Sequence, residues 1–566
     1  MLKLQRVFKD HLQEIIVIGF AFISLLMILP LLHGGIVYNQ FDLQFHLTSV
    51  QESYLNLKNG NWNQIVPAIS TRSFGSFGYP NNLFYPIFTF LPEALIHLII
   101  PNPWLAYLLF MALVIFLIFI SMYILGLKLK FPVFASALGA LIYGFSGFVF
   151  LWSYNNEDLA QVIGLMFLPM VFWGLYQIIL KKQNKWIWLS LGMFGIAMTH
   201  ILSLLIVSFF VAFLLLFLLI NPHQSWKEKG KRFLKFIYAT ITTILMGSFF
   251  LIPLAVNMHY NGDITVAILQ LSKFTISLSN FFFSNIYAIH TQPNWTESSG
   301  IGITSLITLL VIAFNWKKLN FFFKYLTIGL GLFSLLCTNL FPWDLFQNLL
   351  KFIQFPIRFM MIVSFLIALI GAKSFANLEL DSSSLLNQKN YQKLTISLFL
   401  FLGICSFYSG AEFLKHGGLN NLSQKQFKRV ATKWNTLDYL PPQAVKIQPK
   451  LEDHATAKLN PGKKIKQKNY QTKPNELIYT INSSKSYSKI VIPTIYYPGF
   501  QTTVNNRVVK VRTNQNRAIV VPIQKGVNKI TVKYQDPLIK VVAIWISIFT
   551  WIFILFKFIY NWKFER

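Results

Sequence analysis

The sequence predicts an α-helical polytopic membrane protein with about twelve transmembrane helices and one extracytoplasmic β-sandwich-like domain. Three observations lead to this fold class. Charged residues make up only 12% of the chain, about half their share in a typical soluble domain, and the mean hydropathy is +0.51. Segments such as 104–126, 205–220 and 538–556 are apolar for long enough to cross a hydrocarbon core of about 30 Å. The composition becomes polar and lysine-rich after residue 412.

Twelve hydrophobic segments are expected to cross the membrane. The first follows a basic N-terminus and has no small-residue cleavage site, so we expect a retained helix and not a removed signal peptide. The expected spans lie near residues 11–32, 104–126, 132–152, 161–180, 185–199, 201–220, 233–255, 301–315, 321–339, 356–376, 394–412 and 538–558.

The basic residues give the orientation of these spans. Clusters of lysine and arginine fall on one side of the membrane, which the positive-inside rule makes cytoplasmic. This alternation requires the apolar run 185–220 to break at Thr199-His200, which puts His200 at the outer surface. It also requires 84–100 to form an interfacial or re-entrant helix that does not cross. The clusters are Lys3, Arg6 and Lys9; Lys128 and Lys130; Lys181, Lys182 and Lys185; Lys227 to Lys235; Lys317 and Lys318; Lys389 and Lys393; Lys563 and Arg566.

The polar segment 413–535 is expected to form an outward-facing domain. It carries 22 basic and four acidic residues, and its second half contains short alternating runs that are typical of strands. Gly499, Asn505-Asn506 and Gly526 separate these runs as turn formers. A small β-sandwich-like domain is therefore expected, with strands in the runs KIVIPTIYY, TTVNNRVVKV, AIVVPI and KITVKY.

The expected organisation has three parts. A transmembrane domain occupies 1–412 and contains a large first outer loop, 33–103; the basic domain occupies 413–535; a last helix and a short cytoplasmic tail occupy 536–566. We interpret the net charge of +30 as a topology signal and as contact with the lipid bilayer or an anionic envelope polymer, and not with nucleic acid.

Ionisable side chains are nearly absent from the expected membrane interior. A proton- or ion-coupled transporter usually needs such groups, because buried charge is costly and is kept for function. Their scarcity argues against a secondary transporter. Cys337 and Cys405 both fall inside apolar segments, which offers neither a disulfide framework nor zinc-ligand spacing.

The first candidate site follows the first expected span, in the string FDLQFH that begins at Phe41. If this string is helical, Asp42 and His46 lie one turn apart on the same face. The Asp42 carboxylate then suits a general base for a hydroxyl acceptor, with His46 orienting it or binding a phosphate. An Asp/His pair at this spacing also suits part of a divalent metal site, although no third ligand is evident. A solvated loop with an incidental pair is the remaining interpretation.

Further candidates lie at the expected outer ends of the helices. Lys58 and Arg72 continue the first outer loop, and Asp158 belongs to the second, which reads Asn155-Asn156-Glu157-Asp158. His200 at the hairpin tip is either a polar cap or part of a binding site. Arg358, one turn into the tenth span, either extends to lipid phosphate or clamps a ligand's phosphate with its planar guanidinium.

Four strings resemble known families of membrane proteins. The loop strings FDLQFHLTSV and GYPNNLFYPIFTFLPEAL resemble the 6-pyruvoyl-tetrahydropterin synthase-related membrane protein family. The string QFPIRF, from Gln354 to Phe359, is similar to the QFPWRF-type motif of that family and of YfhO-like proteins. The turn YYPGF, from Tyr496 to Phe500, is similar to their YPGW-type turn. The matches follow one another in order from residue 41 to about 535.

This resemblance implies membership in the GT-C class of glycosyltransferases, which take a sugar from a polyprenyl-phosphate carrier with an outer-loop carboxylate. By that resemblance Asp42 is the expected base, with Asp158 and His46 as further catalytic candidates. Arg358, Arg72, Lys58 and His200 are the expected donor-phosphate ligands. The sequence departs from the family pattern in two ways: Ile357 replaces the usual aromatic residue of QFPWRF, and no DxD pair is present. None of the seven residues is assigned to a metal, and metal dependence stays open.

The resulting hypothesis is a hexosyltransferase in the cell membrane, without an organic cofactor and with metal dependence left open. Its partners are the lipid bilayer, a polyprenyl-phosphate-linked sugar, and an anionic envelope polymer or lipid acceptor. The alternative is a non-catalytic membrane protein for export or assembly of an envelope polysaccharide, and a transporter ranks third.

Overall fold

The structure is a computed structural model, and it describes residues 11–32, 36–38, 42–155, 158–181, 185–222, 224–261, 269–284, 299–381, 388–416, 420–422 and 438–564. The basic cluster Lys3, Arg6 and Lys9 therefore lies outside the described residues. The chain forms two compact units. The first comprises Met1–Leu43, Trp104–Thr243 and Ile268–Gln424, and the second comprises Gln44–Pro103, Ile244–Ala267 and Lys425–Arg566.

The first unit is built from helices, several of which are long and apolar. Its two short strands, β1 (Ile36–Tyr38) and β2 (Asn420–Leu422), pair antiparallel. Its helices are α2 (Leu12–Ile28), η1 (Leu29–Leu31), α6 (Pro103–Lys128), α7 (Val133–Gly144), α8 (Gly147–Phe150), the π-helix η5 (Leu151–Asn155), α9 (Leu159–Ile179), α10 (Trp186–Ala197), α11 (Ile201–Ile220), most of α12 (Trp226–Met246), η6 (Leu271–Phe274), α14 (Leu278–Phe283), α15 (Ile303–Asn315), η7 (Trp316–Lys318), α16 (Phe321–Cys337), α17 (Trp343–Leu350), η8 (Lys351–Ile353), η9 (Pro356–Phe359), α18 (Met360–Asp381) and α19 (Gln388–His416).

The described residues contain eight helices that are long and apolar enough to cross a membrane, and each coincides with an expected span. The expected break of 185–220 is confirmed, because α10 ends at Ala197 and α11 begins at Ile201. The count of twelve is not confirmed. The eight helices are Leu12–Leu31, Pro103–Lys128, Val133–Tyr154, Leu159–Ile179, Ile201–Ile220, Pro356–Leu378, Asn390–Ala411 and Leu538–Ile559.

The other four expected spans differ from straight membrane-length helices. Three are shorter: α10 and α16 are apolar helices of fewer than 18 residues, and α15 has 13 residues. The fourth, 233–255, consists of α12 and α13 (Ser248–Asn261), which are bent by 77° at their junction. The intervening residue is Gly247, whose lack of a Cβ makes such a break easier than at other residues.

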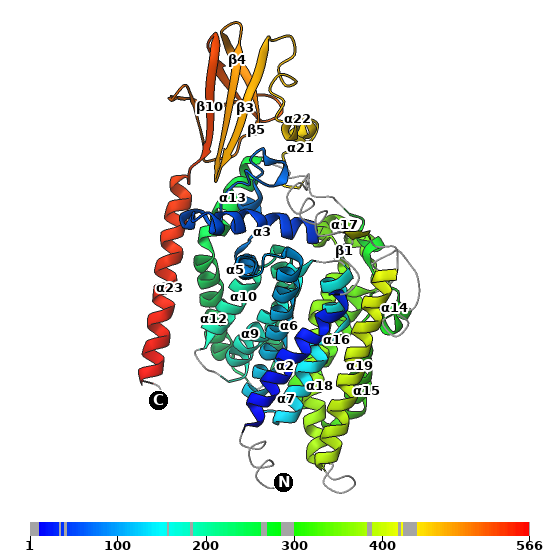
Figure 1. Cartoon of the computed structure of the whole chain (residues 1–566). Helices are drawn as coiled ribbons and strands as arrows, with labels where there is room; N and C mark the ends of the chain where they lie inside the picture. The colour runs from blue at the N-terminus through cyan, green and yellow to red at the C-terminus, as the bar shows by residue number, and fades with distance from the viewer. Residues whose placement is uncertain are drawn as a thin grey trace. The chain divides into compact units, whose positions relative to one another are not determined.

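Helix α18 lies in the middle of the first unit, where α7, α15 and α16 pack along it (Figure 1). Small residues allow these helices to approach closely. A Cβ built on Gly371 of α18 would lie 2.3 Å from Thr308 of α15, and one on Gly139 of α7 would lie 2.8 Å from Ala372. Such small-residue contacts are typical of helix pairs in membranes.

The second unit combines the first outer loop, a bent helix, the strand region and the last helix. Its helices are α3 (Leu43–Lys58), η2 (Trp62–Gln64), η3 (Phe74–Ser76), α4 (Asn81–Phe84), η4 (Phe88–Phe90), α5 (Leu91–Ile99), α13, α21 (Pro442–Val445), α22 (Gln448–Glu452) and α23 (Leu538–Phe564), and its strands are β3 (Ile465–Lys473), β4 (Glu476–Ser483), β5 (Tyr487–Ile495), β6 (Phe500–Val504), β7 (Arg507–Val509), β8 (Arg512–Thr513), β9 (Ala518–Ile523) and β10 (Gly526–Tyr534).

The strands form two antiparallel sheets, one of five strands in the order β3-β4-β10-β6-β7 and one of three in the order β5-β9-β8. Buried residues of both sheets share one hydrophobic core, as in a β-sandwich. All four expected strand runs are confirmed, and Asn505 and Asn506 both take positive φ in the turn between β6 and β7, as type I′ hairpins require. Strands β3, β4 and β8 lie outside the expected runs; of these, β3 is mostly polar, whereas β4 is half apolar.

The core of the sandwich also contains side chains of the first outer loop. Ile69, Phe74, Phe77 and Phe84 are buried in it beside residues of β4, β5 and β10. The compact unit accordingly groups residues from Gln44 to Pro103 with the strand region, whereas the sequence predicted 33–103 as an outer loop of the transmembrane domain. The aromatic residues of this loop account for the difference, because they bury their apolar surface in the sandwich.

The last helix is joined by one hydrogen bond to α13 and by another to the end of α12. The Ser248 hydroxyl donates to the Ala543 carbonyl at 2.7 Å, and the Ser547 hydroxyl donates to the Met246 carbonyl at 2.5 Å. The Met246 carbonyl belongs to the last turn of α12, where the helix break removes its regular partner. Helix α23 therefore stabilises the bent helix within the second unit.

Candidate functional site

The string QFPIRF forms a strained turn that leads directly into α18. Gln354 has φ 62° and ψ −56°, and the Phe355 backbone N–H donates to the Ile353 carbonyl at 2.7 Å. These values define a γ-turn with positive φ, a rare and strained conformation for a residue other than glycine. Pro356 then begins η9, where its fixed φ suits the first helical position.

This turn holds the Arg358 side chain, which is only 4% exposed. Nη1 of Arg358 donates to the Ile353 carbonyl and to Oε1 of Gln354, both at 2.9 Å. The guanidinium carbon also lies 4.6 Å from the centre of the Phe355 ring, within the range of a cation–π interaction. The short segment thus fixes the position of a buried cation by contacts within itself.

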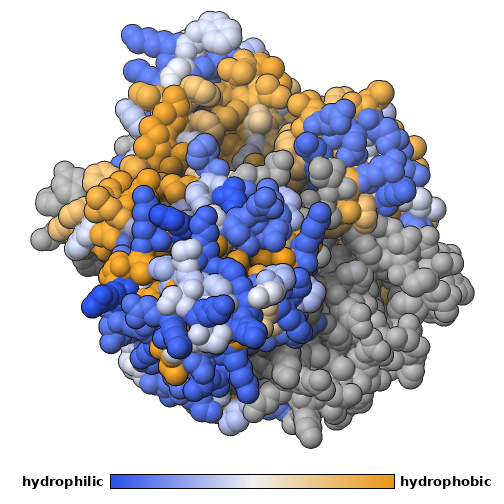
Figure 2. Space-filling model, turned by 90° about the horizontal axis from the view of Figure 1, so that it is seen from above, coloured by the Kyte–Doolittle hydropathy of each residue, from blue (hydrophilic) through white to orange (hydrophobic). Residues whose placement is uncertain are grey.

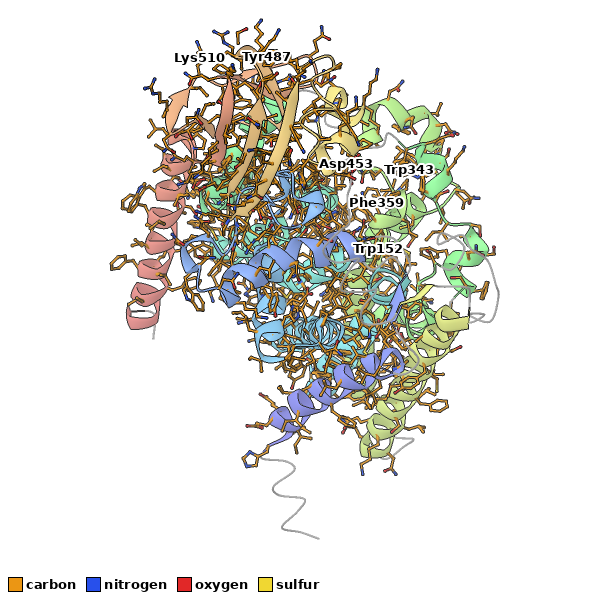
Figure 3. The ribbon with its side chains drawn as sticks, turned by 45° about the horizontal axis from the view of Figure 1, so that its top comes forward. Trp152, Trp343, Phe359, Asp453, Tyr487 and Lys510 are labelled. Atoms are coloured by element: carbon orange, nitrogen blue, oxygen red, sulfur yellow. The ribbon has the colours of Figure 1, made fainter. Side chains whose placement is uncertain are left out.

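Aromatic side chains surround the segment that carries Arg358. The Phe359 ring contacts Phe209, Phe333 and Trp343, with ring centroids 5.7, 6.0 and 6.3 Å away. Figure 3 labels Phe359 and Trp343, which lie near each other in that view. Aromatic packing from three elements, α11, α16 and α17, holds the backbone of the segment in place, with Phe333 and Trp343 buried and Phe209 exposed. A cation in such apolar surroundings interacts strongly with a phosphate that reaches it.

Asp42 and His46, expected one turn apart, have different surroundings. Helix α3 begins at Leu43, so Asp42 immediately precedes the helix, and it is exposed. His46 lies in the first turns of α3 and is 2% exposed, with its ring stacked on Phe90 at 4.7 Å. Asp42 is thus accessible to a substrate, whereas His46 packs among aromatic rings.

Lys58 and Arg72 are both described and lie in different environments. Lys58 ends α3, is exposed, and donates to the Tyr54 hydroxyl at 3.3 Å. Arg72 binds the buried carboxylate of Glu52: its Nε and Nη2 lie 3.1 and 2.9 Å from Oε2. The structure therefore holds Arg72 in an ion pair and leaves Lys58 at the surface.

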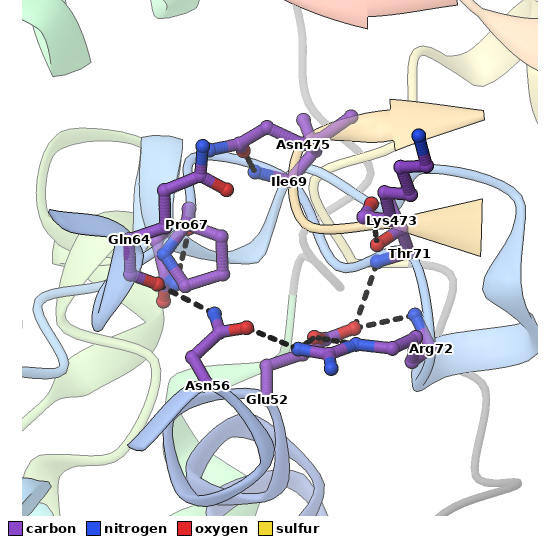
Figure 4. A network of polar contacts seen from close by, with 10 residues as sticks. Glu52, Asn56, Gln64, Pro67, Ile69, Thr71, Arg72, Lys473 and Asn475 are labelled. Carbon is purple, nitrogen blue, oxygen red and sulfur yellow. Dashed lines mark hydrogen bonds and ion pairs between the residues drawn. The ribbon is translucent and has the colours of Figure 1, made fainter. Parts of the chain in front are cut away.

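The Glu52–Arg72 ion pair belongs to a larger polar network (Figure 4). The backbone N–H groups of Thr71 and Arg72 both donate to Oε1 of Glu52, so four donors surround one carboxylate. The Thr71 hydroxyl donates to the Lys473 carbonyl at 2.8 Å, and the Ile69 N–H donates to Oδ1 of Asn475 at 3.2 Å. The network connects α3 to the β3–β4 hairpin, which is a structural role.

Asp158 and His200 each cap a helix of the first unit. Asp158 is 3% exposed; it accepts from the Gln161 backbone N–H at 3.4 Å and from the Gln161 side chain at 2.5 Å, at the start of α9. Nδ1 of His200 accepts from the Ser203 N–H at 3.2 Å, at the start of α11. Such contacts satisfy N–H groups at helix starts. Asn156 and Glu157, from the same expected loop as Asp158, lie outside the described residues.

Two further acidic residues were not identified as important in the sequence analysis. Glu52 anchors Arg72, but nothing in its spacing from Arg72 along the chain indicated that pairing. Glu93 of α5 is 4% exposed, and burial raises the pKa of its carboxyl to about 8. Its Oε2 has no hydrogen-bond partner in the described chain. The prolines and apolar neighbours of Glu93 signalled an interfacial helix but not a buried acid.

Two of the four family-like strings, GYPNNLFYPIFTFLPEAL and YYPGF, meet in the core of the sandwich. Gly78 lies against Leu477 and Thr494, and the Phe84 ring contacts the Tyr497 ring at 6.1 Å. Gly499 needs its positive φ of 110°, and a Cβ there would lie 2.7 Å from the Gln535 carbonyl. These strings therefore serve the fold, which leaves QFPIRF as the one with a buried cation.

The helices define the class: a multi-pass helical membrane protein with a strand region near its C-terminal end. The family model described as "Bacterial membrane protein YfhO" matches residues 74–432 and 443–547. The match covers well over half of the chain, so the chain belongs to this family of bacterial membrane proteins. An uncharacterised protein of Lactococcus lactis subsp. cremoris (strain MG1363) is 26% identical over 362 residues, 59% of this chain. These residues cover 55% of that relative, so the chain spans about half its length.

Proposed function

We propose that the protein is a membrane glycosyltransferase that moves a sugar from a polyprenyl-phosphate donor to an envelope polymer or lipid acceptor. The reaction takes place on the outer face of the membrane. The observation that carries the proposal is the buried Arg358, held by the Ile353 carbonyl, Gln354 and the Phe355 ring at the start of a spanning helix. Such a preorganised cation suits a phosphate that gains charge as it leaves.

The proposed reaction is a single displacement with inversion at the sugar. An acceptor hydroxyl oxygen attacks the anomeric carbon while the bond from that carbon to the phosphate oxygen breaks. The exposed Asp42 carboxylate takes the hydroxyl proton, and Arg358 stabilises the polyprenyl phosphate as it departs. The polyprenyl tail binds apolar helix surfaces, where each buried CH₂ contributes about 0.8 kcal/mol.

The other candidate residues take secondary places in this proposal. Lys58 is exposed at the surface and has no assigned step in this reaction. Arg72, Asp158 and His200 have structural roles. Arg72 forms an ion pair with Glu52, and Asp158 and His200 each cap a helix. His46 positions α3 through its stacking on Phe90. Membership of the GT-C class and the likeness to the 6-pyruvoyl-tetrahydropterin synthase-related family are part of the proposal.

The experiment uses purified protein in proteoliposomes with a radiolabelled polyprenyl-phosphate sugar. Consumption of the donor and transfer of label to an acceptor are the expected results. If the wild-type protein neither consumes nor transfers the donor, a non-catalytic role in export or assembly of an envelope polysaccharide replaces this proposal.

The proposed orientation can be tested separately in intact cells. With Cys337 and Cys405 replaced, single cysteines are placed at Ser484 and Ser225, both exposed, and treated with a membrane-impermeant thiol reagent. Ser484→Cys, in the strand region, should react, and Ser225→Cys, just before α12, should not. The opposite pattern would reverse the topology and remove the proposed outer site.

A further inference from the structure

Helix α17 and the adjoining η8 carry three parallel rows of side chains. Residues spaced i, i+4 and i+7 lie on the same face of a helix. The segment 343–352 therefore divides into rows that begin at Trp343, Asp344 and Leu345. The rows differ in chemistry and in exposure, so each row has surroundings of its own.

The row that begins at Trp343 packs against the rest of the first unit. Trp343 is 1% exposed, and its ring contacts that of Phe359 (Figure 3). Oε1 of Gln347 accepts from the Leu271 N–H at 2.8 Å, and its Nε2 donates to the Leu269 carbonyl at 3.0 Å. The polar Gln347 is thus turned toward the protein, where it holds α17 against η6.

The row that begins at Leu345 is apolar and exposed. Leu345, Leu349 and Phe352, which we call the apolar row, are 81%, 70% and 43% exposed. In water, three large apolar side chains in one row would forgo the favourable free energy of burial. A helix that turns a glutamine inward and two leucines outward fits an apolar medium on its outer side.

A polar row lies directly beside the apolar row. Asp344, Asn348 and Lys351 are all exposed, and Oδ1 of Asp344 accepts from the Ser272 hydroxyl at 2.7 Å. Figure 2 likewise shows hydrophobic surface bordering hydrophilic surface on the face of the molecule seen from above. A short helix that exposes both kinds of surface side by side suits the boundary between membrane and water. A lysine at that boundary is attracted to lipid phosphates.

The apolar row continues the exposed apolar surface of two neighbouring helices. Segments η8 and η9 pack against α11, and η9 also packs against α16. Helix α11, which is long enough to span the membrane, exposes Leu205 and Phe209 near its start, and α16 exposes Leu332 and Leu335 near its end. The surface that a spanning helix presents to lipid therefore extends to α17, and this continuity indicates lipid as the covering medium.

The same segment connects the apolar row to Arg358. Phe352 directly precedes Ile353, which is 2% exposed and whose carbonyl accepts from Nη1 of Arg358 at 2.9 Å. Consecutive Cα atoms lie only about 3.8 Å apart. The depth at which Phe352 enters a lipid leaflet therefore also determines the depth of the buried guanidinium.

We propose that α17 and η8 bind the phospholipid leaflet at the membrane–water boundary, with the apolar row among the upper parts of the acyl chains. Lys351 then lies at the level of the lipid phosphates, and Arg358 is held near the same level. Interfacial helices typically enter this boundary by about 5–10 Å. The lipid contact is independent of the proposed sugar transfer, whereas the arrival of a donor phosphate at this level rests on the proposed function.

The test uses the full-length protein in phosphatidylcholine proteoliposomes, with Cys337 and Cys405 replaced and one nitroxide attached to a single new cysteine. Leu349→Cys puts the nitroxide in the apolar row, and the control Asn348→Cys puts it in the polar row. Electron paramagnetic resonance measures collisions with oxygen, which is enriched in lipid, and with a water-soluble nickel chelate present on both sides of the membrane. Oxygen collisions should exceed nickel collisions by about threefold or more at position 349, and the ratio should reverse at position 348.

A second label measures the depth of the segment beside Arg358. Phe352→Cys carries the nitroxide, and phospholipids with nitroxides at known depths provide the calibration. The label should lie within about 10 Å of the lipid phosphates. A label near the centre of the bilayer would contradict the level assigned to Arg358. Thermal stability of each variant is measured first, so that unfolding is not mistaken for a change in exposure.

Three results would overturn the lipid contact. An excess of nickel collisions at both 348 and 349 would place the apolar row in water. Few collisions with either reagent at 349 would show that protein, such as a second copy of the chain, covers the row. An excess of oxygen collisions at both positions would place the whole helix among the acyl chains. None of these measurements involves sugar transfer, so the expected collisions in an inactive protein would contradict the proposed function and leave this inference intact.

Discussion

Nη1 of Arg358 donates a hydrogen bond to the Ile353 carbonyl at 2.9 Å, and the same carbonyl accepts the Phe355 N–H that closes the γ-turn at Gln354. One carbonyl thus connects the strained backbone to the buried guanidinium. The turn brings the arginine into a fixed position before α18 begins, so the orientation of the guanidinium depends on the turn as well as on its own contacts.

Arg358→Lys should strongly reduce sugar transfer while the protein still folds. Lysine keeps the charge but loses the planar guanidinium that binds phosphate through two hydrogen bonds. The matched control is Arg517→Lys, because Arg517 also donates to a carbonyl, that of Tyr260 at 3.3 Å, and lies 4.9 Å from the Tyr260 ring. Transfer assays in proteoliposomes should show a loss for the first variant alone. Equal activity of Arg358→Lys and wild type would make Arg358 a lipid anchor.

The γ-turn at Gln354 can be tested by comparing Gln354→Gly with Gln354→Ala. Both variants lose the hydrogen bond from Arg358 to Oε1, but only glycine accepts a φ of 62° without strain. Gln354→Gly should therefore be more stable than Gln354→Ala by about 1 kcal/mol, as measured by thermal unfolding. A more stable alanine variant would contradict the assigned backbone strain.

The Glu52–Arg72 ion pair should contribute to stability and not to donor binding. Glu52 is 1% exposed and Arg72 is 17% exposed at their side chains. Arg72→Ala leaves a buried carboxylate uncompensated, which typically costs about 3–5 kcal/mol of folding stability. Because Arg72 is partly exposed, we expect a loss of stability at or below the lower end of that range. Lys58→Ala serves as the control, because Lys58 is exposed and should leave the melting temperature unchanged. Weaker donor binding by folded Arg72→Ala, measured below its melting temperature, would restore Arg72 as a phosphate ligand.

Glu93 should make stability depend on pH. Burial raises the pKa of this carboxyl from 4.5 to about 8, so the folded protein binds one more proton than the unfolded chain between these values. Its contribution to the free energy of unfolding is fully present below pH 4.5 and is lost as the pH rises to about 8. The free energy falls by about 1.4 kcal/mol per pH unit in that range. Glu93→Gln should remove this slope from melting temperatures measured between pH 5 and about 8. A slope unchanged by Glu93→Gln, with Glu476→Gln as the control, would assign it to other groups.

Much of the fold followed from the sequence because its signals are local. Long apolar segments predicted twelve spans, and eight of them are long apolar helices in the described residues. Alternating runs around Gly499 and Asn505-Asn506 predicted β5, β6, β7, β9 and β10. The shorter and bent helices did not follow, because hydropathy alone does not reveal the 77° bend between α12 and α13. The contribution of the first outer loop to the sandwich core was also missed, since it pairs residues about 400 positions apart, such as Ile69 and Asn475.

The candidate site was predictable in its residue types but not in its contacts. Arg358 stands out in QFPIRF, and its burial makes it a stronger candidate than sequence position alone suggested. Arg72 has the same residue type, yet its Glu52 partner lies 20 positions away in the chain and gave no signal. Asp158 and His200 occupy helix starts, where short polar side chains commonly cap N–H groups. A polar residue at an outer helix end therefore identifies function only after its contacts are known.

The catalytic base is the central claim, and Asp42→Asn tests it most directly. Asparagine keeps the shape of the side chain but removes the basic oxygen, and a positioned general base typically contributes about 10²–10⁴-fold. Asp158→Asn is the control, because asparagine also caps helices well. Transfer of radiolabelled sugar from the polyprenyl-phosphate donor is measured in proteoliposomes, together with donor binding and thermal stability. We predict that Asp42→Asn loses turnover by a factor in that range, with donor binding retained, and that Asp158→Asn stays active. Full activity of Asp42→Asn would contradict the account: together with an inactive Asp158→Asn it would move the base to the second outer loop, and with both variants active it would exclude an outer-loop carboxylate as the base.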